Sequence, residues 1–448
     1  MRFTDQQIES ISPNAAAFSA GKKLSPVGKW ETKGKSARVI WGTIKGSGKN
    51  PYYAQIDIQS LAYKCTCPSR QFPCKHAIGL MLLHGEDGSA IAEEEEPDWV
   101  LDWINKRQVR LEKEESTEAK EKTPEEEEKS KKNKEKTQEN RLKSVQEGAA
   151  ELQLWLIDLL RVGLLELPNK KPSEFKKIQA RMLDAKAPAL AGWIRTLAAT
   201  NFSEEGVWQE KVLKLLAKLN LLLKAIRNIE HYDELWQLTI KNLSGWTQSP
   251  KELKADENAE RIKDHWLCVG QTEETNDDIV TQRTWLYGVQ SQRQALVLNF
   301  ATRYSSFESI LMAGSILEAE LLFFPSVQLL RAVVGVQKGV EAYLPDVPLQ
   351  LLTIEEMMQM RKSYVLENPW FNDQVVVLQN CVLRQVGASW YVVGDEGKML
   401  SIASQVLQDK CLNFMAMTGN TPSTLAGVYV NDTFLPFGLI QNQNYFLL

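Results

Sequence analysis

The segment Cys65-Thr66-Cys67-Pro68-Ser69-Arg70-Gln71-Phe72-Pro73-Cys74-Lys75-His76 decides the fold of the N-terminal part of the chain. The sequence has only 6 Cys and 4 His among 448 residues, yet four of those ten fall within these 12 positions. Their spacing, C-x-C-x6-C-x-H, supplies three thiolates and one imidazole, a complete tetrahedral ligand set for zinc. We therefore predict that Cys65, Cys67, Cys74 and His76 bind one Zn(II). Because no coordination position is left for water or substrate, we expect this zinc to be structural.

The flanking residues predict two strands and a helix around this ligand set. Residues 37–45 and 52–58 are rich in β-branched and aromatic side chains, and the glycines, asparagine and proline between them predict a turn. Residues 77–84 are good helix formers, so Cys74 and His76 should lie at a helix N-terminus, where the helix dipole favours a thiolate. Such a small module buries little core, so we expect zinc binding to supply folding free energy.

At this motif the sequence closely resembles the SWIM zinc-finger family, over about residues 37–86. The resemblance implies Cys65, Cys67, Cys74 and His76 as zinc ligands, and a role in binding DNA or proteins. More loosely, the continuation resembles bacterial multidomain SWIM proteins, with a helical region such as 181–191 and a β-rich end. Those proteins are often encoded beside MoxR-type AAA+ ATPases and von Willebrand A-type proteins. The resemblance therefore implies a place in a chaperone-like assembly.

Charge is segregated along the chain, although its formal net value is only -4. Residues 1–90 carry 12 Lys/Arg against 6 Asp/Glu, whereas residues 91–104 carry six acidic residues and no basic one. A basic surface with aromatic side chains can neutralise phosphates and stack bases, which makes nucleic-acid binding the alternative function. The acidic run Glu93 to Glu96 could fold back onto the basic module or repel a phosphate backbone. The flanking basic and aromatic residues are Lys22, Lys23, Lys29, Lys33, Lys35, Arg38, Lys45, Lys49, Lys64, Arg70 and Lys75, with Tyr52, Tyr53, Tyr63 and Phe72.

An amphipathic helix is predicted directly after the finger, at residues 91–104. Its spacing places Trp99, Val100, Trp103 and Ile104 on one face. This face could dock on a partner, but packing on the zinc module is the plainer interpretation.

The remaining sequence divides by its periodicity into an α+β multidomain protein: a small zinc-clamped strand-strand-helix module, an α-helical bundle and β-rich C-terminal domains. Leucines recur at helical spacing after about residue 147, and β-type runs dominate from Trp266 onward. The expected units are an N-terminal extension over 1–36, the zinc finger over 37–90, the acidic amphipathic helix over 91–104 and a charged linker, disordered or helical, over 105–146. They continue with a helical domain over 147–245, a β-containing domain over 260–335, a helical connection over 336–368 and a β-rich domain over 370–448.

Catalytic motifs are not recognisable in the sequence. His84, His231 and His265 stand apart, without a Gly-x-Ser-x-Gly or His-Glu-x-x-His pattern. No secretory leader or long apolar segment is apparent either. We expect a cytoplasmic, non-enzymatic protein that binds a protein partner, with nucleic acid as the alternative and with neither a membrane nor a small-molecule substrate as partner. A third hypothesis is an enzyme with an unrecognised site within residues 260–448.

Overall fold

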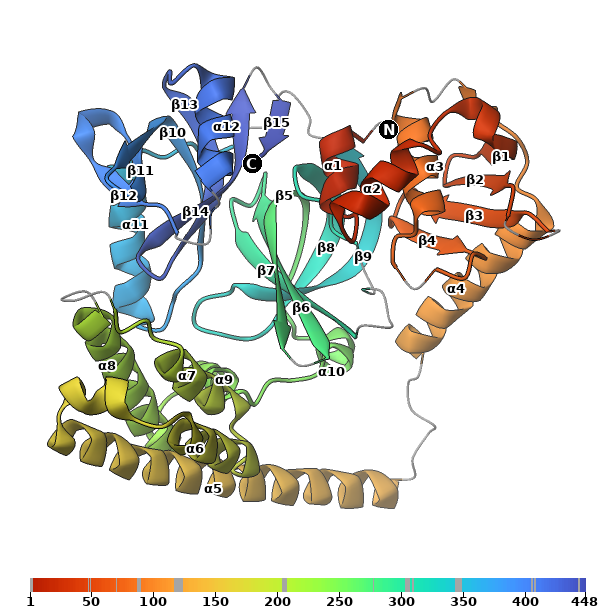
Figure 1. Cartoon of the computed structure of the whole chain (residues 1–448). Helices are drawn as coiled ribbons and strands as arrows, with labels where there is room; N and C mark the ends of the chain where they lie inside the picture. Colours follow the sequence, from red (N-terminus) through yellow and green to blue (C-terminus); the bar gives the residue numbers. More distant parts are fainter. Residues whose placement is uncertain are drawn as a thin grey trace.

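The structure is a computed structural model that describes residues 3–46, 48, 50–69, 71–86, 90–116, 124–203, 208–276, 278–302, 307, 310–342, 349–403, 406, 408–441 and 444–448. Helices and strands alternate in blocks along the chain, and four units result (Figure 1). The predicted α+β multidomain architecture is confirmed: strands with the cysteine cluster come first, then a helical bundle, then C-terminal sheets.

The zinc module is an antiparallel sheet of order β1-β2-β3-β4 with helices on one face. Its elements are α1 (Asp5–Ser10), α2 (Ala15–Lys22), β1 (Trp30–Lys35), β2 (Val39–Ile44), β3 (Tyr52–Asp57), β4 (Ala62–Cys65) and α3 (Lys75–Glu86). Side chains alternate across β2 because successive residues of a strand point to opposite faces: Ile40 packs in the core with α3, and Val39 and Trp41 pack on the other face. Strand β1 and both short helices lie within 1–36, so that segment belongs to the module and is not an extension.

Two helices follow where an acidic helix and a linker were expected. Helix α4 (Asp98–Ser116) begins and ends later than the predicted helix at 91–104, and α5 (Pro124–Val162) crosses from the linker into the bundle. Pro124 starts α5, a position that suits proline because the first N–H of a helix has no intrahelical acceptor. Residues 132, 133 and 135–140 of α5 are exposed, whereas Val145, Ala149 and Leu152 are buried. The charged segment is therefore helical over the described residues 105–116 and 124–146.

The helical bundle packs the C-terminal half of α5 against shorter helices, and its buried side chains form a separate core. These helices are α6 (Pro172–Asp184), α7 (Pro188–Ala198), α8 (Trp208–Arg227) and α9 (Glu234–Ser244). The short helix α10 (Pro250–Ala255) follows them and packs on the next unit, where Leu253 forms a buried cluster with Leu322 and Phe324. Figure 1 shows the bundle below the two β units, with α5 extending beyond it.

The third unit is a closed barrel of strand order β5-β6-β7-β9-β8. Its strands are β5 (Arg261–Asn276), β6 (Ile279–Gly288), β7 (Gln294–Thr302), β8 (Ser315–Phe323) and β9 (Arg331–Ala342). Strand β9 closes the barrel by pairing antiparallel with β8 and parallel with β7. The expected boundary at residue 335 therefore falls inside a strand, and the segment 336–368 contains the end of β9 before its helix.

The fourth unit is a sheet of order β12-β11-β10-β13-β14-β15, with α11 (Ile354–Glu367) and α12 (Gln408–Thr418) packed on one face. Its strands are β10 (Gln374–Val386), β11 (Ser389–Val393), β12 (Met399–Ser401), β13 (Ser423–Val430), β14 (Thr433–Gln441) and β15 (Asn444–Leu447). The other face shares a core with the outside of the barrel. Leu267 and Val269 pack there against Val375 and Val377.

The zinc module also shares buried core with the barrel. Phe3 and Ile8 belong to one continuous cluster with barrel residues such as Trp266. The buried Gln7 Nε2 donates to the carbonyl of Gly314 at 3.0 Å. The zinc module and the C-terminal sheet are therefore both packed on the barrel. No described helix combines the length and the apolar character needed to cross a membrane.

Candidate metal centre

The four predicted ligands come together at one end of helix α3. Cys65 ends β4, Cys67 follows two residues later, Cys74 directly precedes α3, and His76 lies in its first turn. Their ligand atoms all lie within 4.8 Å of one another, and within the described parts of the chain no second metal-type cluster of His, Cys, Asp and Glu is found. The ligand set that the spacing predicts is thus positioned to hold one zinc ion.

The geometry of the cluster fits tetrahedral zinc. Cys65 Sγ lies 3.8 Å from His76 Nδ1, close to the edge of about 3.6 Å expected for Zn–S and Zn–N bonds of about 2.3 and 2.1 Å. Cys74 and His76 are buried, and Cys65 and Cys67 are partly exposed. Three sulfurs and one nitrogen fill the coordination shell, so a zinc held there would clamp β4 to α3 and leave no open site for hydrolysis.

The surroundings of Cys74, above all the neighbouring Cys65, favour its anionic form. A hydrogen bond with Cys65, together with contacts to the His76 side chain and the backbone N–H of Ala77, lowers the pKa of Cys74 to about 4. The Cys65 pKa is raised by the same hydrogen bond with Cys74, and then by burial. A thiolate is the form that binds zinc, so the neighbouring Cys65 thiol, with smaller contributions from His76 and the Ala77 N–H, favours the form of Cys74 that coordinates the metal.

Two of the four aromatic residues near the motif, Tyr52 and Tyr63, pack against the buried core of the module. The ring of Tyr52 lies 5.2 Å from that of His76, and burial, with a smaller effect of the Cys74 charge, raises the pKa of Tyr63. Tyr53 and Phe72 remain exposed, at 37% and 43%. The sequence alone predicts one stacking surface made of all four. Adjacent residues of a strand point to opposite faces of the sheet, and this alternation is the sequence signal that separates Tyr52 from Tyr53.

Basic side chains around the motif have different roles. Lys64 and Lys75 are exposed beside the ligands. Lys22 pairs with Asp5 at 2.7 Å, and Arg38 pairs with the buried Asp57 at 3.4 Å. Among the others, Lys23, Lys29 and Lys45 are exposed, Lys33 and Lys35 are partly buried, and Lys49 and Arg70 lie outside the described residues.

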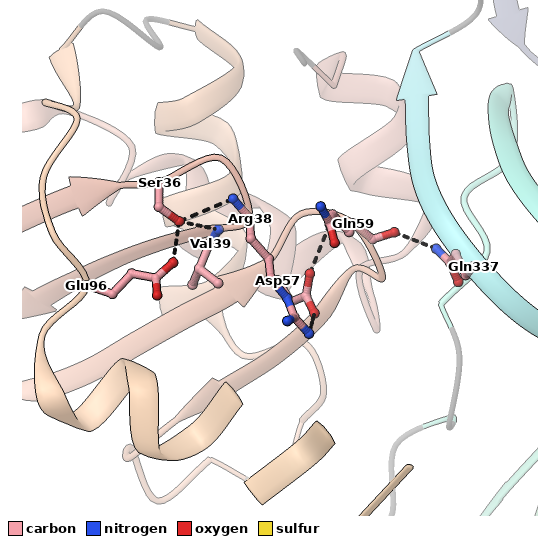
Figure 2. A network of polar contacts seen from close by, with 7 residues as sticks. All are labelled: Ser36, Arg38, Val39, Asp57, Gln59, Glu96 and Gln337. Carbon is pink, nitrogen blue, oxygen red and sulfur yellow. Dashed lines mark hydrogen bonds and ion pairs between the residues drawn. The ribbon is translucent and has the colours of Figure 1, made fainter. Parts of the chain in front are cut away.

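The acidic run folds back along the outer edge of β1. Lys35 N donates to Ala92 O at 3.0 Å, and Glu94 N donates to Lys35 O at 3.1 Å. Figure 2 shows Ser36 Oγ donating to Glu96 Oε1 at 2.6 Å while the same oxygen accepts from the backbone N–H groups of Arg38 and Val39. Strands β1 and β4 are opposite edges of the sheet. The acidic run therefore covers the edge far from the metal ligands.

Helix α4 packs on the module, as the plainer interpretation of its apolar face predicts. Val100 and Ile104 form a buried cluster with Val39 and Trp41. Trp99 also meets the ring of Tyr53 at 5.1 Å, edge to face. This face of α4 is used within the chain.

The histidines outside the motif stay apart: His84 is buried in α3, His231 is exposed, and His265 lies in β5.

Comparison with known families agrees with both the metal site and the bundle. Residues 52–85 match the SWIM zinc finger, and residues 140–243 match the SWIM-associated four-helix bundle domain. The chain therefore carries a SWIM zinc finger and its associated bundle, as the resemblance implied. No curated protein and no solved structure matches the chain.

Proposed function

We propose that this protein is a non-enzymatic interaction protein of the cytoplasm, in which zinc stabilises a module that binds a protein partner. One observation carries the proposal: the ligand atoms of Cys65, Cys67, Cys74 and His76 lie within 4.8 Å of one another and would fill the tetrahedral coordination shell of a zinc ion. A metal with a full shell cannot activate water or substrate. The contribution of the site is then the shape of the surface that it holds in place.

The surface that would meet the partner lies beside the metal ligands. Tyr53 and Phe72 are exposed, and so are the side chains of Lys64 in β4 and Lys75 at the start of α3. Aromatic residues are enriched in protein interfaces because they bury a large rigid area at a small entropic cost. The partner should therefore present an apolar pocket with acidic residues around it.

We further propose that the partner belongs to a MoxR-type AAA+ ATPase assembly. Support for this comes from the resemblance to bacterial multidomain SWIM proteins. In a directed binding experiment, this ATPase is the first partner to test.

The test is an affinity pull-down with the intact protein and with a Tyr53→Ala, Phe72→Ala double variant. A matched control, Tyr232→Ala with Leu235→Ala, removes two similarly exposed apolar side chains from the bundle region. We expect the finger variant alone to lose the partner while its zinc content stays at one per chain. Equal recovery with both variants would contradict the proposed surface.

Nucleic-acid binding is the second candidate, favoured by the position of the acidic run on the edge of the sheet opposite β4. Lys64 and Lys75 are thus not covered by it. A mobility shift over a range of salt concentrations tests this, because each phosphate contact contributes a slope of about -0.9 to log K against log salt for duplex DNA. The variant Lys64→Glu, Lys75→Glu should lose binding, and the control Lys224→Glu, Lys251→Glu should keep it. Absence of binding at low salt would remove this candidate.

A further inference from the structure

We propose that helix α8 forms the interface of a homodimer, in which it packs antiparallel against α8 of a second copy of this chain. Its outer side carries a row of exposed residues at spacings of three and four, so these residues share one face of the helix. The row, called the α8 stripe below, consists of Glu210, Leu213, Ala217, Leu221 and Lys224. Figure 1 shows α8 at the margin of the molecule, where a second copy can approach it.

The α8 stripe is complementary to itself when its direction is reversed. Leu213 and Leu221 lie at equal distances on either side of Ala217 in the sequence, and so do Glu210 and Lys224. A two-fold axis through Ala217 therefore places Leu213 beside Leu221 of the partner subunit. The same axis places Glu210 beside Lys224 of the partner subunit. A dimer with two-fold symmetry uses the same patch on both subunits, and such a patch must be self-complementary in this way.

The small residue at the centre of the α8 stripe permits close packing. Helix axes lie about 8–10 Å apart, and the side chains at the contact determine the distance. Two facing Ala217 methyl groups allow a separation at the lower end of this range. Leu213 and Leu221 on either side can then reach past the axis of the contact and fill the space beside the alanine of the other helix.

The charges at the two ends of the α8 stripe favour a second copy in the antiparallel orientation. Glu210 is 71% exposed and pairs with Lys214 at 2.9 Å, but Lys214 also contacts Asp432 at 3.2 Å. Glu210 can therefore turn to Lys224 of the partner subunit while Lys214 keeps Asp432. Two such pairs form in each dimer, one at each end. A parallel arrangement would place like charges together, so the charges select the antiparallel one.

Helix α5 widens the apolar face beside the α8 stripe. The two helices run antiparallel, because Gln146 Nε2 of α5 donates to Ile226 O at 3.4 Å and Gln153 Nε2 donates to Asn220 Oδ1 at 3.3 Å. Continued along α5, this register brings two further apolar side chains to the level of the stripe. They are Ile157 and Leu160, which are 39% and 51% exposed.

The size of this face matches a dimer of moderate stability. Leu213 and Leu221 are 56% and 44% exposed, so with Ile157 and Leu160 the apolar patch covers on the order of 400 Å². Two copies of this face, together with their charged ends, bury about the 1,000 Å² in total that a specific interface needs. We therefore expect the dimer to dissociate at micromolar concentrations.

Sedimentation velocity of the full-length protein from about 1 to 200 µM tests the proposal. We expect a monomer–dimer equilibrium with a Kd of about 1–100 µM. A monomer at every concentration would overturn the proposal and leave the face to a different protein.

Substitutions in the α8 stripe locate the interface. Ala217→Glu brings two like charges together at the axis and should weaken the dimer about tenfold or more. The control Leu183→Glu, at an exposed position of α6, should leave the Kd unchanged. Both substituted positions are exposed, so urea unfolding should show that each variant keeps its fold. An unchanged Kd in Ala217→Glu would contradict the proposed interface.

A charge exchange tests the antiparallel orientation. Glu210→Lys places two lysines together at each end and should weaken the dimer about 3–10-fold. The double variant Glu210→Lys, Lys224→Glu restores opposite charges across the axis, so its Kd should return to within about threefold of the original. A double variant as weak as the single one would overturn the antiparallel arrangement. These outcomes do not bear on the finger surface, which is tested separately.

Discussion

Removal of zinc from the intact protein should release the N-terminal helices from the barrel as well as disorder the finger. The metal would hold the first turn of α3, and the other end of α3 meets the N-terminal segment: a Cβ added to Gly85 would lie only 2.6 Å from Phe3 O. Phe3 and Ile8 are buried in the cluster that continues into the barrel. Loss of the metal at one end of α3 therefore removes the support for α1 at the other.

The free energy that holds the zinc module on the barrel can be worked out from the contacts between them. They include two hydrogen bonds, Gln7 Nε2 to Gly314 O at 3.0 Å and Gln337 Nε2 to Gln59 O at 2.7 Å (Figure 2 shows the second), and the buried side chains of Phe3 and Ile8. At about 0.5–1.5 kcal/mol per hydrogen bond and about 1.5–3 kcal/mol per buried side chain, these contacts contribute about 4–9 kcal/mol. A structural zinc contributes about 10–16 kcal/mol of folding free energy, which is more than these contacts contribute and is enough to decide whether the contacts form.

Hydrogen exchange on metal-loaded and chelator-treated protein measures this effect. Since about 1.4 kcal/mol corresponds to a factor of ten, exchange in α1 and α3 should accelerate about 1,000-fold or more after zinc removal. Exchange in α6 and α7 should change little, because the bundle has its own core. The reasoning is refuted if α1 keeps its protection in protein that elemental analysis shows to be free of metal.

Three further substitutions test other parts of the structure. Ile104→Ala should cost about 2–5 kcal/mol in chemical unfolding and detach α4, whereas Leu101→Ala on its exposed side should stay within about 0.5 kcal/mol. Gly79→Ala should lower the free energy of unfolding by about 1–3 kcal/mol, and with it the melting temperature, because a Cβ there would lie 2.9 Å from the Cβ of Leu24 and 3.1 Å from the carbonyl oxygen of Gly21 in α2. At Gly28 a Cβ meets no atom within 4 Å, so Gly28→Ala is the control. Burial is the main cause of the raised pKa of the Asp373 carboxyl, so in the native state this group stays protonated above the ordinary pKa of about 3.9, where it is already ionised in the unfolded chain. The free energy of unfolding should therefore fall as the pH rises from about 3.9 through the raised pKa. Asp373→Asn should remove that slope in urea unfolding from pH 4 upward, and an unchanged slope would contradict the assignment.

The metal site was predictable from sequence because its ligands are close in the chain and chemically distinctive. Cys65 to His76 span one loop, so their spacing alone determines the donor set. The apolar face of α4 was predictable for a similar reason, since Val100 and Ile104 recur at helical spacing. In both cases the information is local.

Strands β1 and β9 were not predictable because their own residues do not favour a strand. Strand β1 reads Trp-Glu-Thr-Lys-Gly-Lys, and β9 contains Gly335 and Gly339. Their conformation is determined by partners: β1 pairs with β2 on one side and residues 92–94 on the other, and β9 closes the barrel. The docking of the module on the barrel has no periodic signature either, so no window of sequence could reveal it.

The contact between Gln7 and Gly314 also has a consequence for synthesis, because 307 residues separate the two. At about 5–20 residues per second, the ribosome needs about 15–60 s to produce the barrel loop after the first helix has been made. During that time the side chains of Phe3 and Ile8 lack the barrel residues that share their buried cluster in the folded protein. Early capture of zinc by Cys65, Cys67, Cys74 and His76 would keep the nascent module compact over this interval. Cells short of zinc should therefore accumulate aggregated newly made chains before they lose protein that has already folded.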